Sequence, residues 1–102
     1  MGHKAQYRPQ RLAAKLLQIR RDLGLSQSRL AKLLDFPVKT STARVSEYEN
    51  GIREPGLTLI LRYARIVGVA VEVLIDDDLN LPQRVKLKKR RKGADIRHSE
   101  NI

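Results

Sequence analysis

Short apolar stretches at helical spacing, interrupted by glycine or proline, are the feature that most constrains this chain. Leu12, Leu16, Ile19 and Leu23 lie four, three and four residues apart, so they occupy one face of a helix that ends at Gly24. Further helices of this kind are predicted over 26–34, 41–50 and 57–67. The expected fold class is therefore all-α, a bundle of four to five short helices.

The last two apolar stretches carry the remaining fold predictions. In the helix 57–67, the residues expected to face the core are Leu57, Ile60, Leu61, Ala64 and Val67. The next stretch, 69–75, leaves two alternatives open. A strand is favoured by the alternation of Val69, Val71, Val73 and Ile75, and a short helix by the spacing of Val71, Leu74 and Ile75.

The formal net charge of +10 is concentrated near the end of the 102 residues. Residues 11–83 carry eleven basic and nine acidic side chains, whereas residues 84–102 carry eight basic and two acidic ones. We therefore predict an N-terminal arm over 1–8, a folded domain over 9–83 and a basic, disordered tail over 84–102. Such tails commonly meet phosphates, although a merely solvated tail is the simpler alternative. The tail cations expected to contact phosphate without reading sequence are Lys86, Lys88, Lys89, Arg90, Arg91 and Lys92.

Composition excludes several classes of function. The chain has no cysteine, which excludes thiolate chemistry, disulfides and cysteine-bearing zinc sites. No apolar run approaches the roughly 20 residues of a membrane span. The N-terminus lacks the apolar segment of a secretion signal. The expected location is the cytoplasm, without membrane association.

Catalysis and metal binding are not predicted. Asp76, Asp77 and Asp78 are adjacent, but neighbouring carboxylates on regular structure point in different directions, so a solvated helix end or a contact with the tail is expected instead. His3 and His98 stand without obvious partners. Since no nucleophile set or phosphate loop is present, we expect no enzyme activity and no cofactor.

The helix predicted over 41–50 has an unusual outer face. Val45 and Tyr48 would be buried, and the residues around them are small, hydroxyl-bearing or singly charged. Short side chains let a helix enter a major groove closely enough to touch base edges. Together with the capped helix 26–34, this segment has the parts of a helix-turn-helix.

Three segments resemble one known family. LGLSQSRLAKLL, RVSEYENGIREP and IREPGLTLILRYARIVGVAVEVLI resemble the lambda-repressor-like, Xre/Cro-type helix-turn-helix proteins over about Leu12 to Leu79. The resemblance implies a lambda repressor-like bundle that binds double-stranded DNA. One departure is the stretch DFPVKTSTAR, whose turn is longer than the family's by about four residues. Either the turn bulges and the helix keeps its face, or the helix starts earlier and presents another; counting back from ENG favours the bulge.

The resemblance also implies a role for individual residues. Those expected to contact bases are Thr42, Ala43, Arg44, Ser46 and Glu47. Those expected to contact phosphate are Gln27, Ser41, Asn50 and Arg53, with helix capping the main role of Ser41. Arg20 and Glu49 match a pair that forms a structural ion pair between the first and third helices.

These features lead to one principal function and two alternatives. We expect a sequence-specific regulator associated with the nucleoid, a repressor that reads a palindromic operator as a homodimer, with 69–75 as the candidate dimer surface. One alternative is the antitoxin of a toxin–antitoxin pair, whose tail folds on a toxin. The other is a coactivator-like protein that bridges protein partners and binds DNA weakly. Neither alternative implies a membrane partner.

Overall fold

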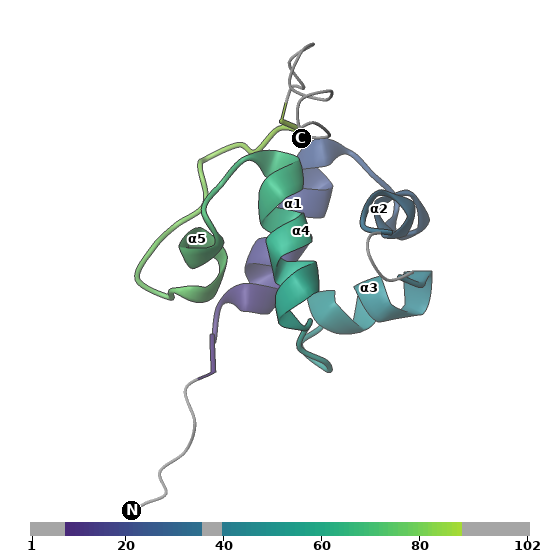
Figure 1. Cartoon of the computed structure of the whole chain (residues 1–102), viewed down its shortest axis with the longest axis horizontal. Coiled ribbons are helices and arrows are strands. Elements are labelled where there is room, and N and C mark those ends of the chain that lie inside the picture. The colour runs from purple at the N-terminus through teal and green to yellow at the C-terminus, as the bar shows by residue number, and fades with distance from the viewer. Residues whose placement is uncertain (1–7, 36–39, 89–102) are drawn as a thin grey trace, which may run out of the picture.

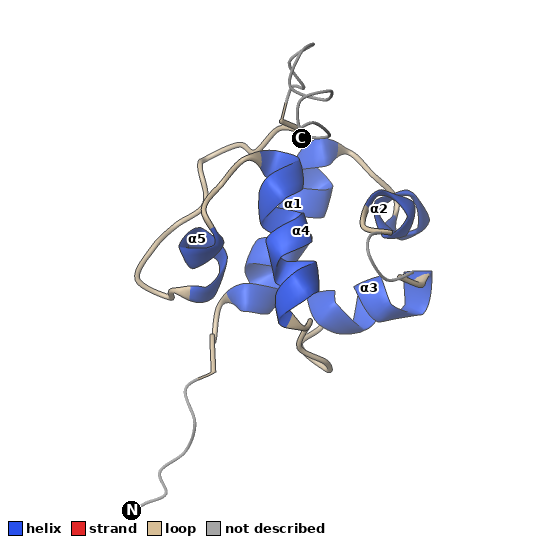
Figure 2. Ribbon diagram, in the orientation of Figure 1, coloured by secondary structure: helices blue, strands red, loops and turns tan. Residues whose placement is uncertain are grey.

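Five helices build the part of the chain that the structure describes. The computed structural model describes residues 8–35 and 40–88, and within these ranges every regular element is a helix (Figures 1 and 2). The helices are α1 (Leu12–Leu23), α2 (Gln27–Leu33), α3 (Thr42–Glu49), α4 (Leu57–Val67) and α5 (Val71–Ile75). The predicted all-α bundle is confirmed, and the open alternative for 69–75 is resolved in favour of a helix.

The other helices lie on either side of two central helices. In Figure 1, α1 and α4 lie in the middle, with α2 and α3 on one side and α5 on the other. The buried core is aliphatic apart from Tyr48 and Tyr63. The largest fully buried side chains are Tyr63, Leu16, Ile19, Leu30, Leu34, Leu74 and Val45. Burial of these apolar side chains is the main source of stability in a domain of this size.

Local sequence signals set the helix boundaries. Gly24 adopts φ 69°, a left-handed conformation that favours glycine, and so ends α1. Ser26 caps α2 by accepting a hydrogen bond from the backbone N–H of Arg29 at 3.1 Å. Ser41 caps α3 in the same way, with the backbone N–H of Arg44 at 3.1 Å.

The predicted buried face of α4 is partly wrong. Leu57 is 83% exposed and Leu61 is 37% exposed, whereas Tyr63 is completely buried. The helix LTLILRYARIV is apolar on more than one face, so spacing alone could not choose between overlapping stripes. The face that carries Tyr63 turns inward, and the ring of Tyr63 belongs to the core.

A buried lysine fastens α5 to α1. The side chain of Lys15 donates from Nζ to the backbone carbonyls of Val73 at 2.7 Å, Leu79 at 2.8 Å and Asp76 at 3.0 Å. Lys15 is 3% exposed, and this burial lowers the pKa of its ammonium group. The Lys15 ammonium group therefore donates hydrogen bonds to carbonyls at the end of α5 and in the turn that follows, which accept no hydrogen bond within a helix.

Asp77 fastens the same region to the start of α1. Its carboxylate accepts from the backbone N–H groups of Gln10 and Arg11, each at 2.9 Å. These two hydrogen bonds lower the pKa of Asp77. The Asp76 carboxylate accepts from the backbone N–H of Asp78 instead, so the acidic residues have separate local roles. Within residues 8–35 and 40–88, no cluster of histidine or acidic residues has the arrangement of a metal site.

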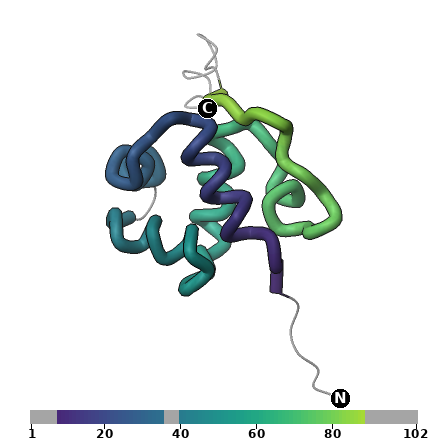
Figure 3. The backbone as a smooth tube through the Cα atoms, turned by 180° about the vertical axis from the view of Figure 1, so that it is seen from behind, coloured from purple at the N-terminus to yellow at the C-terminus, as the bar shows by residue number. Residues whose placement is uncertain are grey.

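The folded part continues past the expected boundary at residue 83. Val85 is 2% exposed, and its backbone N–H donates to the Asp22 carboxylate at 3.0 Å. The backbone N–H of Lys88 donates to the carbonyl of Ile66 at 2.8 Å. Figure 3 shows this yellow-green segment passing beside α1 and returning to the end of α4. An isolated apolar residue in a basic stretch gave too weak a signal to predict this packing.

The basic tail is described only at its beginning. Lys86 and Lys88 are exposed, whereas the other predicted tail contacts, Lys89, Arg90, Arg91 and Lys92, lie outside the described residues. None of the helices in the described ranges has the length and apolarity needed to cross a membrane.

Candidate nucleic-acid interface

One edge of α3 is packed into the bundle and the opposite face is open. Val45 and Tyr48 are buried against the other helices, as the spacing predicted. The outer face of α3, defined here as Thr42, Ala43, Arg44, Ser46 and Glu47, is exposed in its first three residues and partly exposed in the last two. This arrangement matches the first of the two alternatives for the long turn, in which α3 keeps its expected face. Residues 36–39 of that turn lie outside the described part of the chain.

The beginning of α3 is narrow as well as exposed. Thr42 and Ala43 have short side chains, and Ser41 before them is engaged as the N-cap. Arg44 is therefore the one long side chain in the first turn of the helix. A helix of this shape can approach the floor of a major groove with a single bidentate donor in front.

Glu47 is already engaged within the protein. Its Oε1 accepts from Nε of Arg53 at 2.9 Å and lies 3.5 Å from Nε of Arg44. The chain turns back here because Gly51 adopts φ 73°, and the backbone N–H groups of Ile52 and Arg53 both donate to the Glu47 carbonyl. Neither ion pair was predicted from the sequence. The three-residue spacing of Arg44 and Glu47 could have indicated one of them, whereas the pair with Arg53 depends on the turn.

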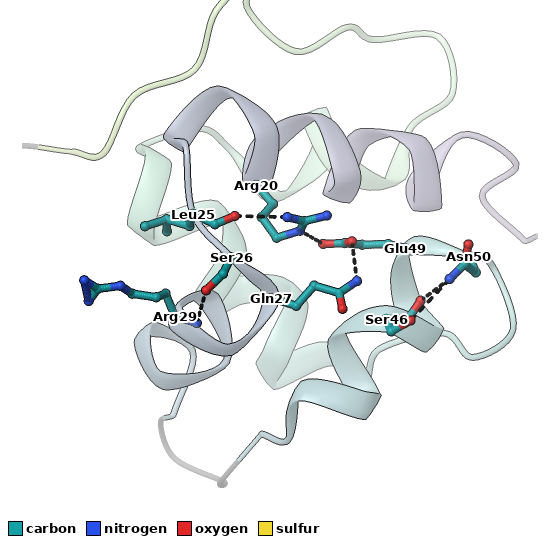
Figure 4. A network of polar contacts seen from close by, with 8 residues as sticks. All are labelled: Arg20, Leu25, Ser26, Gln27, Arg29, Ser46, Glu49 and Asn50. Carbon is teal, nitrogen blue, oxygen red and sulfur yellow. Dashed lines mark hydrogen bonds and ion pairs between the residues drawn. The ribbon is translucent and has the colours of Figure 1, made fainter.

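Asn50 turns towards α3 and forms bonds there. Its side-chain amide donates to the carbonyl of Ser46 at 2.9 Å and to the Ser46 hydroxyl at 3.3 Å (Figure 4). This side chain was expected to contact phosphate. In the structure it adds a second hydrogen bond to the Ser46 carbonyl, which also accepts from the backbone N–H of Asn50 at 3.0 Å, so a phosphate contact would require the side chain to turn outward.

A buried carboxylate joins α1, α2 and α3. Glu49 Oε2 accepts from Arg20 Nε at 2.8 Å, and Oε1 accepts from the side-chain amide of Gln27 at 3.2 Å (Figure 4). Arg20 also donates to the carbonyl of Leu25 at 3.0 Å. The Glu49 side chain is 3% exposed and that of Arg20 is 20% exposed. The sequence predicted the bridge between Arg20 and Glu49, but not that Gln27 would join it.

These pairings decide the charge that α3 presents. The helix contains one basic and two acidic residues, a poor balance for approaching a polyanion. Each carboxylate, however, is matched by an arginine from outside the helix, Arg20 for Glu49 and Arg53 for Glu47. With both pairs counted, Arg44 leaves the charges on and around α3 with a net charge of +1, although its Nε also lies 3.5 Å from the Glu47 carboxylate.

Comparison with protein families identifies this arrangement. Residues 16–74 match the helix-turn-helix family over more than half of the chain, from within α1 to the last turn of α5. The chain belongs to the lambda-repressor-like (Xre) helix-turn-helix family. It is therefore a DNA-binding transcription regulator. Searches of curated proteins and of solved structures returned no significant match.

The helix-turn-helix match includes every residue expected to contact DNA between Gln27 and Arg53. It leaves out the start of α1 and the segment after residue 74. These outer parts hold Lys15, Asp77 and Val85, which brace the bundle from outside the matched region. The matched region thus contains the candidate DNA contacts, and the contacts of Lys15, Asp77 and Val85 lie outside it.

Proposed function

We propose that this protein is a repressor that binds a palindromic operator as a homodimer, with α3 in the major groove. The observation that carries the proposal is the contrast across α3. One edge is fixed by Val45, Tyr48 and the buried Glu49 network, and the other is open and lined by small polar side chains. A recognition helix needs both properties, since base reading requires a close and rigid approach.

Each residue on the interface then has a distinct role. Arg44 is the candidate for bidentate recognition of guanine, and Thr42 and Ala43 for contact with a thymine methyl group. Gln27, at the start of α2, and Arg53, after α3, lie in the elements that flank the groove and are the candidates for phosphate contacts. Lys86 and Lys88 would add attraction to DNA that does not depend on base sequence.

Homodimerisation belongs to the same proposal, but the surface differs from the one expected first. The expected segment 69–75 contributes the fully buried Leu74 to the core of its own chain. Ile52 and Leu57 are 74% and 83% exposed, so they offer more apolar surface to a second copy. Two copies related by a two-fold axis would present their α3 helices about 34 Å apart, one turn of DNA.

Selection from random duplex DNA tests the proposal. The full chain should enrich a palindrome whose half-sites are about 10 base pairs apart from centre to centre. A shorter chain that ends at Lys88 should enrich the same site with a weaker salt dependence, since it keeps the packed Val85 segment. Failure of both chains to enrich any sequence would reject sequence-specific binding.

Two single substitutions, one of them a control, test whether α3 recognises the bases. Arg44→Ala should relax the preference at one position of each half-site by about 10- to 100-fold. Arg65→Ala removes another exposed arginine, on α4, and should leave the preference unchanged. Placing the enriched site over a promoter then distinguishes repression from activation by the direction in which transcription changes.

A further inference from the structure

Glu47 is a carboxylate on the face that would meet DNA. The phosphate backbone repels such a group, and the repulsion weakens binding to every sequence. The Glu47 side chain is 35% exposed and therefore lies at the surface that DNA would approach. Its position calls for a physical role beyond helix formation.

The contacts of Glu47 place it between two arginines that the proposed function uses. Arg53 Nε is 2.9 Å from Glu47 Oε1, and Arg44 Nε is 3.5 Å from the same oxygen. Both arginine side chains remain about half exposed, at 48% and 49%. One carboxylate thus partly neutralises a candidate phosphate contact and a candidate base contact at once.

We infer that Glu47 increases the specificity of DNA binding. Its carboxylate competes with phosphates for Arg53 and Arg44, and so weakens binding to DNA that lacks the correct bases. This inference rests on the proposed function. On random DNA, a phosphate must compete with the Glu47 carboxylate for the guanidinium groups. On the operator, the carboxylate can accept a hydrogen bond from a cytosine N4 amino group, which offsets the repulsion.

The geometry favours a positioning role over a purely structural one. Glu47 accepts a hydrogen bond only from Nε of Arg53, so its negative charge weakens the attraction of that guanidinium to phosphate without covering the terminal nitrogens. An ion pair this exposed adds little to folding stability. The main effect of the carboxylate should therefore appear in DNA binding.

The test is Glu47→Gln in the full chain, because this change removes the charge and keeps the size of the side chain. Affinity is measured for the duplex that the wild-type chain selects and for a shuffled duplex of the same composition, over a range of salt concentrations. We expect binding to the shuffled duplex to rise roughly tenfold near 0.1 M salt, the effect of one additional phosphate contact, and the salt slope to steepen by about one. Binding to the selected duplex should change by less than about threefold, since the lost base contact offsets the gain.

Two controls isolate the ion pairs. Glu54→Gln removes the same charge from the exposed residue next to Arg53. Glu54 forms no ion pair within the described residues. This substitution should preserve the ratio of the two affinities. In an Arg53→Ala background, Glu47→Gln should lose most of its effect on the shuffled duplex. Thermal unfolding of each variant confirms that the fold is retained.

The outcomes separate the inference from the proposed function. If the wild-type chain selects no sequence, the proposed function fails and the inference fails with it. If the wild type selects a site and Glu47→Gln leaves the ratio of affinities unchanged, only the inference is overturned. An equal loss of discrimination in Glu54→Gln would overturn it too, because net charge rather than the Arg53 pair would then be responsible.

Discussion

Glu47 and Glu49 lie two positions apart on the same helix, and each is paired with an arginine from another segment. The Glu49 side chain is 3% exposed and joins three helices through Arg20 and Gln27. The Glu47 side chain is 35% exposed and joins α3 only to the turn that follows it. Their chemistry is the same, and their surroundings differ.

The difference teaches that burial decides what an ion pair does. Removing one partner from a buried pair leaves an uncompensated charge in a poorly solvated place, which strongly destabilises the fold. Water solvates an exposed charge almost as well as its partner does, so an exposed pair adds little stability. Glu49 should therefore determine folding, and Glu47 should determine binding.

The largest expected effect comes from breaking the buried network. Glu49→Ala leaves Arg20 and Gln27 without their acceptor and should lower the free energy of unfolding by about 3 kcal/mol. Denaturant unfolding monitored by circular dichroism measures the change. A loss below about 1 kcal/mol would show that water replaces the carboxylate and that the pair is less buried in solution.

A second buried charge sharpens the comparison because its partners are carbonyls and not an opposite charge. Lys15→Met should lower the free energy of unfolding by about 2 kcal/mol, since three carbonyls lose their donor while the apolar stem is kept. Lys32→Met, at an exposed position on α2, is the matched control. Equal effects of the two substitutions would contradict the role assigned to Lys15.

Asp77 extends the comparison to a carboxylate held by backbone N–H groups. Because its pKa in the folded protein is below the ordinary 3.8, its contribution is fully present above pH 3.8 and is lost as the pH falls through the folded value. Asp77→Asn should therefore lower the melting temperature at pH 7, and the difference from wild type should shrink in acid. Asp78→Asn, at the neighbouring exposed position, is the matched control and should lower the melting temperature at pH 7 by less.

The smallest expected effect completes the comparison. Glu47→Ala should change the free energy of unfolding by no more than about 0.5 kcal/mol, although it removes two ion pairs. The same denaturant unfolding experiment measures it beside Glu49→Ala. A loss comparable to that of Glu49→Ala would show that exposure does not separate the two carboxylates.

Most of the fold could be predicted because its signals are local. Helical spacing, the caps Ser26 and Ser41 and the stop at Gly24 each involve residues within one or two turns of one another. The same local pattern identified α3 as a helix with an open outer face. Apolar spacing did not predict the buried face of α4 correctly, because several faces of this helix are apolar and only packing around Tyr63 selected one.

The amino-acid sequence by itself determined the all-helical fold, the helix boundaries and the outer face of α3, because neighbouring residues decide these properties. Apart from the Arg20–Glu49 pair, which the family resemblance implied, only the tertiary structure decided which charged and polar groups meet. Lys15 contacts carbonyls at 73–79, Asp77 caps the start of α1, and Gln27 joins the Glu49 carboxylate. Such contacts depend on where distant segments lie in space, and no periodicity within either segment encodes that.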